Sequence, residues 1–186
     1  IHFEKAREDI DGAYAAINQA FAAHLLQQHP EVLFVTATGK DYFAQYSQKY
    51  RAAGLDTLPN VRVSEYIYDM PVQMAAADIV IARAGAMTLS ELALMRKAAI
   101  LIPSPNVAND HQYKNAKALG DAGAAVYARE SEFEGGGLQM RVEMLLCDAQ
   151  KRAEMREKIA GFARVDANAL VLAEVEGLLS SKGGRA

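Results

Sequence analysis

Hydrophobic and polar positions follow two alternating patterns along the chain. Short apolar runs rich in β-branched residues are typical of strands that are buried on both faces, since such strands lose the regular alternation of apolar and polar positions. Five runs fit this description, at 32–38, 61–66, 78–83, 98–103 and 124–128.

The segments between these runs have helical spacing. Apolar residues recur at steps of three or four at Ile17, Phe21 and Leu25 and again at the tyrosines 42, 46 and 50, and helices are also expected at 87–95, 111–119 and within 138–179. Strands that alternate with helices indicate βαβ crossovers. We therefore expect one α/β domain over residues 1–186, with a Rossmann-like, doubly wound parallel sheet and helices on both faces.

Composition and charge make some classes of protein unlikely. The net charge is −3 and basic and acidic residues are interspersed, so the chain lacks the basic face that nucleic acid requires. Cys147, predicted to lie in the core, is the only cysteine and the four histidines are scattered, so we expect no metal site. No apolar run approaches the roughly 20 residues that cross a bilayer. The chain begins without Met, and we expect it to be a fragment of a longer protein, a trimmed product or an engineered chain.

Ligands of such sheets bind where strands end and helices begin. The loop after the third strand has small residues at 84–86 and then opens a helix, whose free amides at Met87 and Thr88 would attract phosphate. Glu91, one turn on, would accept hydrogen bonds from a ribose. Thr88 and Glu91 also fit a capping box, which would need no ligand.

The loop after the fourth strand, 103–116, also leads into a helix. Asn109 or Asp110 would be the N-cap, with His111 and Gln112 in the first turn and Asn115 one turn later. Their neutral polar groups suit sugar hydroxyls, although a capped surface helix explains them too.

The loop after the second strand carries Tyr66, Ile67 and Tyr68. These residues would surround a flat ring, and the backbone near Ile67 would form hydrogen bonds with the edge of that ring. Alternatively, the three side chains belong to the core.

Three motifs together resemble the C-terminal lobe of the MurG-type N-acetylglucosaminyltransferases, glycosyltransferases of family 28. They are Tyr-Ile-Tyr-Asp-Met at 66–70, Arg-Ala-Gly-Ala-Met-Thr-Leu-Ser-Glu at 83–91 and Asp-His-Gln-Tyr-Lys-Asn-Ala at 110–116. The resemblance extends from about residue 12 to residue 179.

The resemblance implies a GT-B enzyme of peptidoglycan biosynthesis that converts lipid I to lipid II, by inverting transfer from UDP-GlcNAc, and so serves cell-wall growth, cell shape and division. The parent enzyme would be peripheral to the cytoplasmic side of the bacterial inner membrane, contacting lipid I and the membrane through an N-terminal lobe. No cofactor or metal is implied.

The resemblance also assigns site residues. Ile67 would bind uracil through its backbone, and the diphosphate and nearby ribose would meet Ala86, Met87 and Thr88. Glu91 would hold the ribose hydroxyls, and the GlcNAc hydroxyls would meet His111, Gln112 and Asn115.

Two departures qualify the resemblance. The family's glycine-rich phosphate loop corresponds here to residues 8–13, where Glu8, Asp9 and Asp11 would repel a diphosphate. The acceptor lobe is outside the sequence, so we expect no catalytic residue here and no turnover by this chain alone. Two alternatives stay open: the donor lobe of another transferase, such as a diacylglycerol glycosyltransferase, and a non-catalytic truncated fold.

Overall fold

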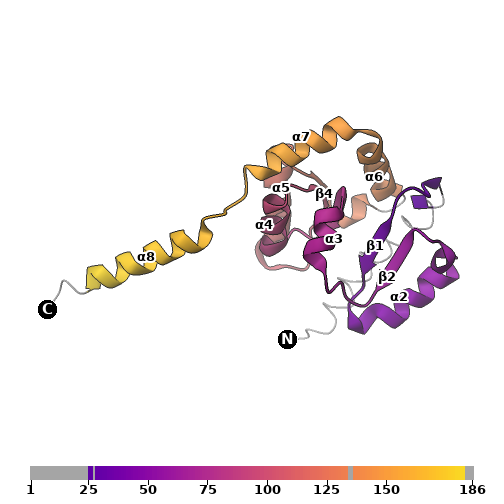
Figure 1. Cartoon of the computed structure of the whole chain (residues 1–186), viewed down its shortest axis with the longest axis horizontal. Coiled ribbons are helices and arrows are strands. Elements are labelled where there is room, and N and C mark those ends of the chain that lie inside the picture. The colour runs from indigo at the N-terminus through magenta and orange to yellow at the C-terminus, as the bar shows by residue number, and fades with distance from the viewer. Residues whose placement is uncertain (1–24, 27, 134–135, 183–186) are drawn as a thin grey trace.

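A computed structural model describes residues 25–26, 28–133 and 136–182. Figure 1 shows a compact α/β body from which one C-terminal helix projects. The predicted helix around Ile17 and Phe21 and the segment 8–13 lie outside the described residues.

All five predicted strands are present, each shorter than its apolar run. They are β1 (Phe34–Ala37), β2 (Val61–Ser64), β3 (Ile79–Ala82), β4 (Ala98–Leu101) and β5 (Val126–Tyr127). All their pairings are parallel, which confirms the predicted fold class. Among the described residues the strands form two sheets, β1–β2 and β3–β4–β5.

Helices connect and cover the strands. They are α2 (Lys40–Ala52), α3 (Met70–Ala76), α4 (Ala86–Leu94), α5 (His111–Asp121), α6 (Gly137–Cys147), α7 (Ala149–Ala160) and α8 (Ala167–Lys182). Short 3₁₀ turns lie at η1 (Leu55–Thr57), η2 (Ala108–Asp110) and η3 (Glu130–Glu132). The segment 138–179 thus contains three helices, and Asp148 caps α7 by accepting a 2.8 Å hydrogen bond from the Lys151 amide.

The fully buried strand β4 separates two apolar layers. Ala98 and Ile100 face a cluster that includes Leu138, Val142 and Leu145 of α6. The alternate positions, Ala99 and Leu101, face a second cluster built with residues of α4 and α5. Successive side chains of a strand point to opposite faces, so the two clusters show that helices cover both sides of the sheet.

The β1–β2 sheet has its own core. Tyr46 and Tyr50 of α2 pack there with Leu26 and Leu55, as the spacing of the tyrosines predicts. The Asn60 carboxamide donates to the carbonyls of Leu26, His29 and Val32, which ties the start of β2 to the segment before β1.

Candidate nucleotide-sugar site

The loop between β3 and α4 presents unpaired amides at a helix start. Gly85 is the N-cap residue in an extended conformation, and α4 begins at Ala86 without a side-chain cap. The first backbone bond within the helix runs from the Leu89 amide to the Gly85 carbonyl, at 3.0 Å. The amides of Ala86, Met87 and Thr88 therefore have no partner inside the helix and are available to an anion.

The capping box expected at Thr88 and Glu91 is not formed. Because α4 begins at Ala86, Thr88 is its third residue and is too far along the helix to be the N-cap. Glu91 is exposed, and neither side chain forms a hydrogen bond or ion pair with the part of the chain that the structure describes. The Glu91 carboxylate is thus free to accept hydrogen bonds one turn below the open amides.

Arg83 fixes the start of this loop. Its guanidinium donates a 3.1 Å hydrogen bond to the Ile102 carbonyl after β4 and forms an ion pair with Glu130 of η3. The two side chains are 21% and 12% exposed, so water screens this pair less than a surface pair. One side chain thereby joins the ends of β3, β4 and β5.

The loop between β4 and α5 enters its helix through two left-handed residues. Asn109 and Asp110 have φ values of 56° and 51°, and Asp110 occupies the predicted N-cap position without a side-chain capping bond. The Asp110 carboxylate instead lies 3.1 Å from Nη2 of Arg129, and this hydrogen bond raises the pKa of Arg129. Arg129 also stacks on the ring of Tyr113, 3.8 Å from its centroid.

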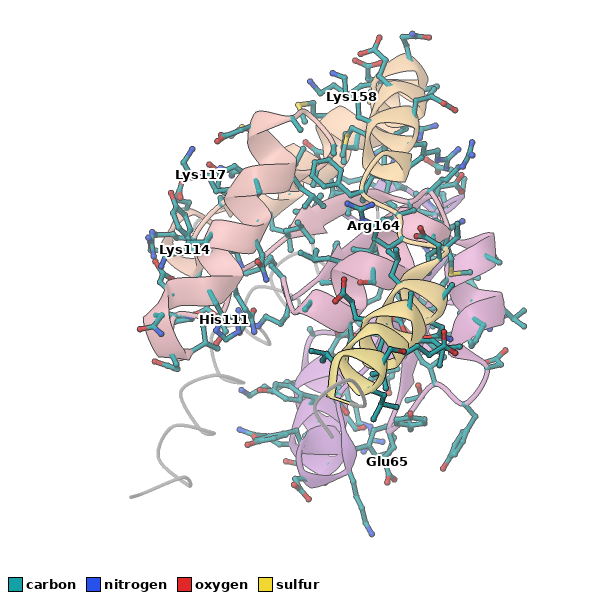
Figure 2. All side chains as sticks on the ribbon, turned by 90° about the vertical axis from the view of Figure 1, so that its left-hand side faces the viewer. Glu65, His111, Lys114, Lys117, Lys158 and Arg164 are labelled. Carbon is teal, nitrogen blue, oxygen red and sulfur yellow. The ribbon has the colours of Figure 1, made fainter. Side chains whose placement is uncertain are left out.

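His111 is exposed at the start of α5, with Lys114 and Lys117 further along the helix (Figure 2). Its Nδ1 lies 2.9 Å from the Ala108 carbonyl. A carbonyl oxygen only accepts, so Nδ1 carries the hydrogen of this bond. In the neutral ring Nε2 is then an acceptor, which suits a sugar hydroxyl.

Gln112 and Asn115 are both half-buried, and each makes a bond to a loop. Oε1 of Gln112 accepts from the Ser104 amide at 3.0 Å, which leaves the Gln112 amino group without a bond to the described chain. Nδ2 of Asn115 donates to the Ala84 carbonyl at 3.2 Å. The Asn115 bond joins the loops that precede α4 and α5, so the structure brings the second and third predicted motifs together.

The loop after β2 is the third loop of the predicted site. Tyr66 and Tyr68 are 63% and 91% exposed, so the interpretation of these tyrosines as core residues is wrong. Their rings meet edge to face with centroids 5.1 Å apart. Ile67 is half-buried, and its backbone makes no hydrogen bond to the described residues. No hydrogen bond between described residues joins this loop to the other two.

Cys147 is exposed at the end of α6, so its predicted place in the core is wrong. The apolar face of α6 is occupied by Leu138, Val142 and Leu145 instead. Within the described ranges, no three His, Cys, Asp or Glu residues lie close enough together to hold a metal ion. None of the described helices combines the length and the apolar character needed to cross a membrane.

These features define a Rossmann-like domain whose α4 and α5 helices open side by side onto a polar site. The model of the glycosyltransferase family 28 C-terminal domain matches residues 13–171. The chain belongs to this family, which confirms the resemblance of its three motifs.

The chain is also similar to curated proteins that are named as transferases. It is 41% identical over 161 residues to the UDP-N-acetylglucosamine–N-acetylmuramyl-(pentapeptide) pyrophosphoryl-undecaprenol N-acetylglucosamine transferase of Bacteroides thetaiotaomicron, covering 86% of this chain and 42% of the relative. The transferase of the same name from Salinibacter ruber is 40% identical over 163 residues, covering 87% and 42%. The chain therefore spans less than half the length of these relatives.

A solved structure supports the same fold. The crystal structure of Acinetobacter baumannii MurG superimposes with a TM-score of 0.70 at 27% identity, covering 89% of this chain and 49% of that one. The glycosyltransferase of kitacinnamycin, at 20% identity and a TM-score of 0.60, shares the fold.

Proposed function

We propose that this domain binds UDP-N-acetylglucosamine as the donor lobe of the transferase that adds N-acetylglucosamine to lipid I. The open first turn of α4 carries the proposal, since three unpaired amides lie one turn above the free carboxylate of Glu91. Amides at a helix start favour a diphosphate, and a carboxylate accepts from ribose hydroxyls. The names of the relatives supply the sugar and the lipid-linked acceptor.

Each of the three loops would contact one part of the donor. The backbone of Ile67 reads the edge of uracil, the amides of Ala86, Met87 and Thr88 bind the diphosphate, and Glu91 holds the ribose. His111, through Nε2, and Gln112, through its free amino group, address the sugar hydroxyls. Transfer inverts the anomeric centre, and the amides of α4 stabilise the charge that develops on the departing UDP.

The acceptor in this proposal is a polyprenyl-linked sugar. The parent enzyme would therefore act at a membrane, and we propose the cytoplasmic face of the bacterial inner membrane. The lipid and the membrane would be contacted by the further lobe that the longer relatives contain. The catalytic groups would come from that lobe as well.

Calorimetric titration with UDP tests the ribose assignment. Glu91→Ala should weaken UDP binding about ten- to hundredfold, because a hydrogen bond to a charged group contributes about 1.5–3 kcal/mol. Glu174→Ala, an exposed carboxylate on α8, is the control and should bind UDP like the wild type. Equal affinities for the wild type and Glu91→Ala would contradict the assignment.

Sugar selectivity tests the role of α5. UDP-N-acetylglucosamine should bind more tightly than UDP-glucose or UDP-galactose, and His111→Ala with Gln112→Ala should reduce that preference while UDP affinity is retained. Preference for UDP-glucose by the wild type would favour the donor lobe of another transferase. Failure of the wild type to bind any uridine nucleotide would contradict the proposed function.

A further inference from the structure

The peptide that leads into α4 is held from two sides. Arg83 binds it to the ends of β4 and β5 through the Ile102 carbonyl and Glu130. In addition, the side chain of Asn115 donates to the carbonyl of Ala84, the next residue. Ala84 is fully buried, so water does not replace a bond that is lost there.

Asn115 acts from the helix that carries the other half of the site. It lies one turn beyond His111 and Gln112 on α5, and Gln112 is itself tied to the Ser104 amide. Because Asn115 and Gln112 share one rigid helix, the bond to Ala84 fixes the starts of α4 and α5 relative to each other.

The bonded carbonyl is well placed to orient the open amides. The Ala84 carbonyl belongs to the same planar peptide as the amide of Gly85, which is the N-cap of α4. Rotation of this peptide would turn Gly85 and shift the first turn at Ala86, Met87 and Thr88. A hydrogen bond to that carbonyl therefore restrains the direction in which the amides point.

We propose that Asn115 is a positioning residue, which holds the diphosphate-binding turn of α4 in register with the sugar-binding start of α5. This inference rests on the proposed function and adds to it, since one Nδ2 hydrogen of Asn115 is bonded to Ala84 while Oδ1 makes no bond to the described chain and stays open to a sugar hydroxyl. Asn115 acts on the phosphate end of the donor through the Ala84 peptide. A role confined to a direct contact with the sugar is the alternative.

The two roles differ in which ligand loses affinity. A positioning residue affects every ligand that carries a diphosphate, so Asn115→Ala should weaken UDP about three- to tenfold and UDP-N-acetylglucosamine by at least the same factor. A sugar contact affects UDP-N-acetylglucosamine alone. Calorimetry with both ligands on the wild type and the variant separates these patterns.

Two further variants control the experiment. Asn115→Asp has nearly the same shape but no donor, and it should lose affinity for both ligands at least as strongly as Asn115→Ala. Lys114→Ala changes the neighbouring exposed residue on α5 (Figure 2) and should leave both affinities unchanged. Thermal unfolding of each variant reports whether the fold is retained.

An NMR measurement on the free protein tests the orientation of the amides directly. The ¹⁵N–¹H signals of Gly85, Ala86, Met87 and Thr88 should shift in the uncharged variant Asn115→Ala, while that of Ile67 in the loop after β2 should stay in place. A role confined to the stability of α5 would not produce this pattern.

The outcomes distinguish this inference from the function on which it rests. Absence of UDP binding to the wild type would overturn both. Wild-type binding combined with a loss confined to UDP-N-acetylglucosamine, or with no loss in Asn115→Ala and Asn115→Asp, would overturn the positioning role and leave the donor site standing. Loss of affinity for UDP as well as for UDP-N-acetylglucosamine, with the shifted amides, supports it.

Discussion

Lys97 is a buried lysine that completes the end of a helix. It is 8% exposed, and its ammonium group donates to the carbonyls of Ala75 and Ala77 at 2.6 and 3.0 Å. These carbonyls lie at the C-terminal end of α3, where the last carbonyls of a helix lack partners within it. A side chain from the turn before β4 thus caps α3.

Lys97→Met should therefore destabilise the domain. The substitution keeps most of the apolar stem but removes the donor to the carbonyls of Ala75 and Ala77. The free energy of unfolding should fall by about 1–3 kcal/mol. Urea denaturation followed by circular dichroism measures the loss, and Lys114→Met, at an exposed position of α5, is the control. Equal stability of the two variants would show that Lys97 does not cap α3.

The same residue gives a pH dependence. Burial lowers the pKa of Lys97 and nearby Arg156 lowers it further, while Asp78 opposes the shift. The unfolded chain, with a lysine pKa of about 10.4, then binds more protons than the folded chain between the two pKa values. Wild-type stability relative to Lys97→Met should rise as the pH increases through this alkaline range. A difference that stays constant or falls would contradict this prediction.

At the scale of elements, Gly120 sets how closely α5 approaches β5. A Cβ at this position would lie 2.1 Å from Cδ1 and 2.2 Å from Cε1 of Tyr127. The Tyr127 ring also meets the ring of Tyr113 edge to face, with centroids 5.9 Å apart. Glycine is needed here for space, although its conformation is helical.

Gly120→Ala should therefore destabilise the domain by about 1–3 kcal/mol, because overpacking outweighs the better helix propensity of alanine. Gly177→Ala is the matched control within α8, where a Cβ meets nothing within 4 Å and should raise helicity. Thermal unfolding and circular dichroism measure both. Stabilisation by Gly120→Ala would mean that the Tyr127 ring moves aside at little cost.

The strands were predictable because their apolar runs are short, rich in β-branched residues and separated by helical spacing. The sheet arrangement was harder to predict, since strand order depends on contacts between distant residues. Cys147 shows the same limit: it follows the apolar residues of α6 in sequence, but the helix turns it outward to solvent. The spacing of apolar residues predicts approximately which face of a helix is buried. Packing against neighbouring elements decides whether a residue at the border of that face is buried or exposed.

At the candidate site, the motifs located the loops correctly, because strand ends meet at one edge of a parallel sheet. The state of Thr88 and Glu91 was not predictable, since the capping box and the open helix start differ by three residues in where α4 begins. The bond from Asn115 to Ala84 spans 31 residues and has no local signal in the sequence. Spacing within one motif does not reveal a contact between two motifs.

At the scale of the whole molecule, α8 differs from every other helix of the described chain. It stands away from the body at the end of an extended stretch (Figure 1), and its residues 167–180 are all exposed. Apolar side chains are distributed all around it, as Leu170, Val171, Leu172 and Val175 are between 46% and 64% exposed. The stability of the body therefore does not rest on α8.

A pair of substitutions tests this division. Leu172→Lys in α8 should change the unfolding free energy by no more than about 0.5 kcal/mol, as is usual for an exposed site. Leu145→Ala in α6 removes a fully buried side chain from the cluster beneath β4 and should cost about 2–5 kcal/mol. Urea denaturation measures both at one protein concentration. A large loss in Leu172→Lys would mean that α8 packs onto the body in solution, since a lysine is tolerated there only while the helix stays exposed to water.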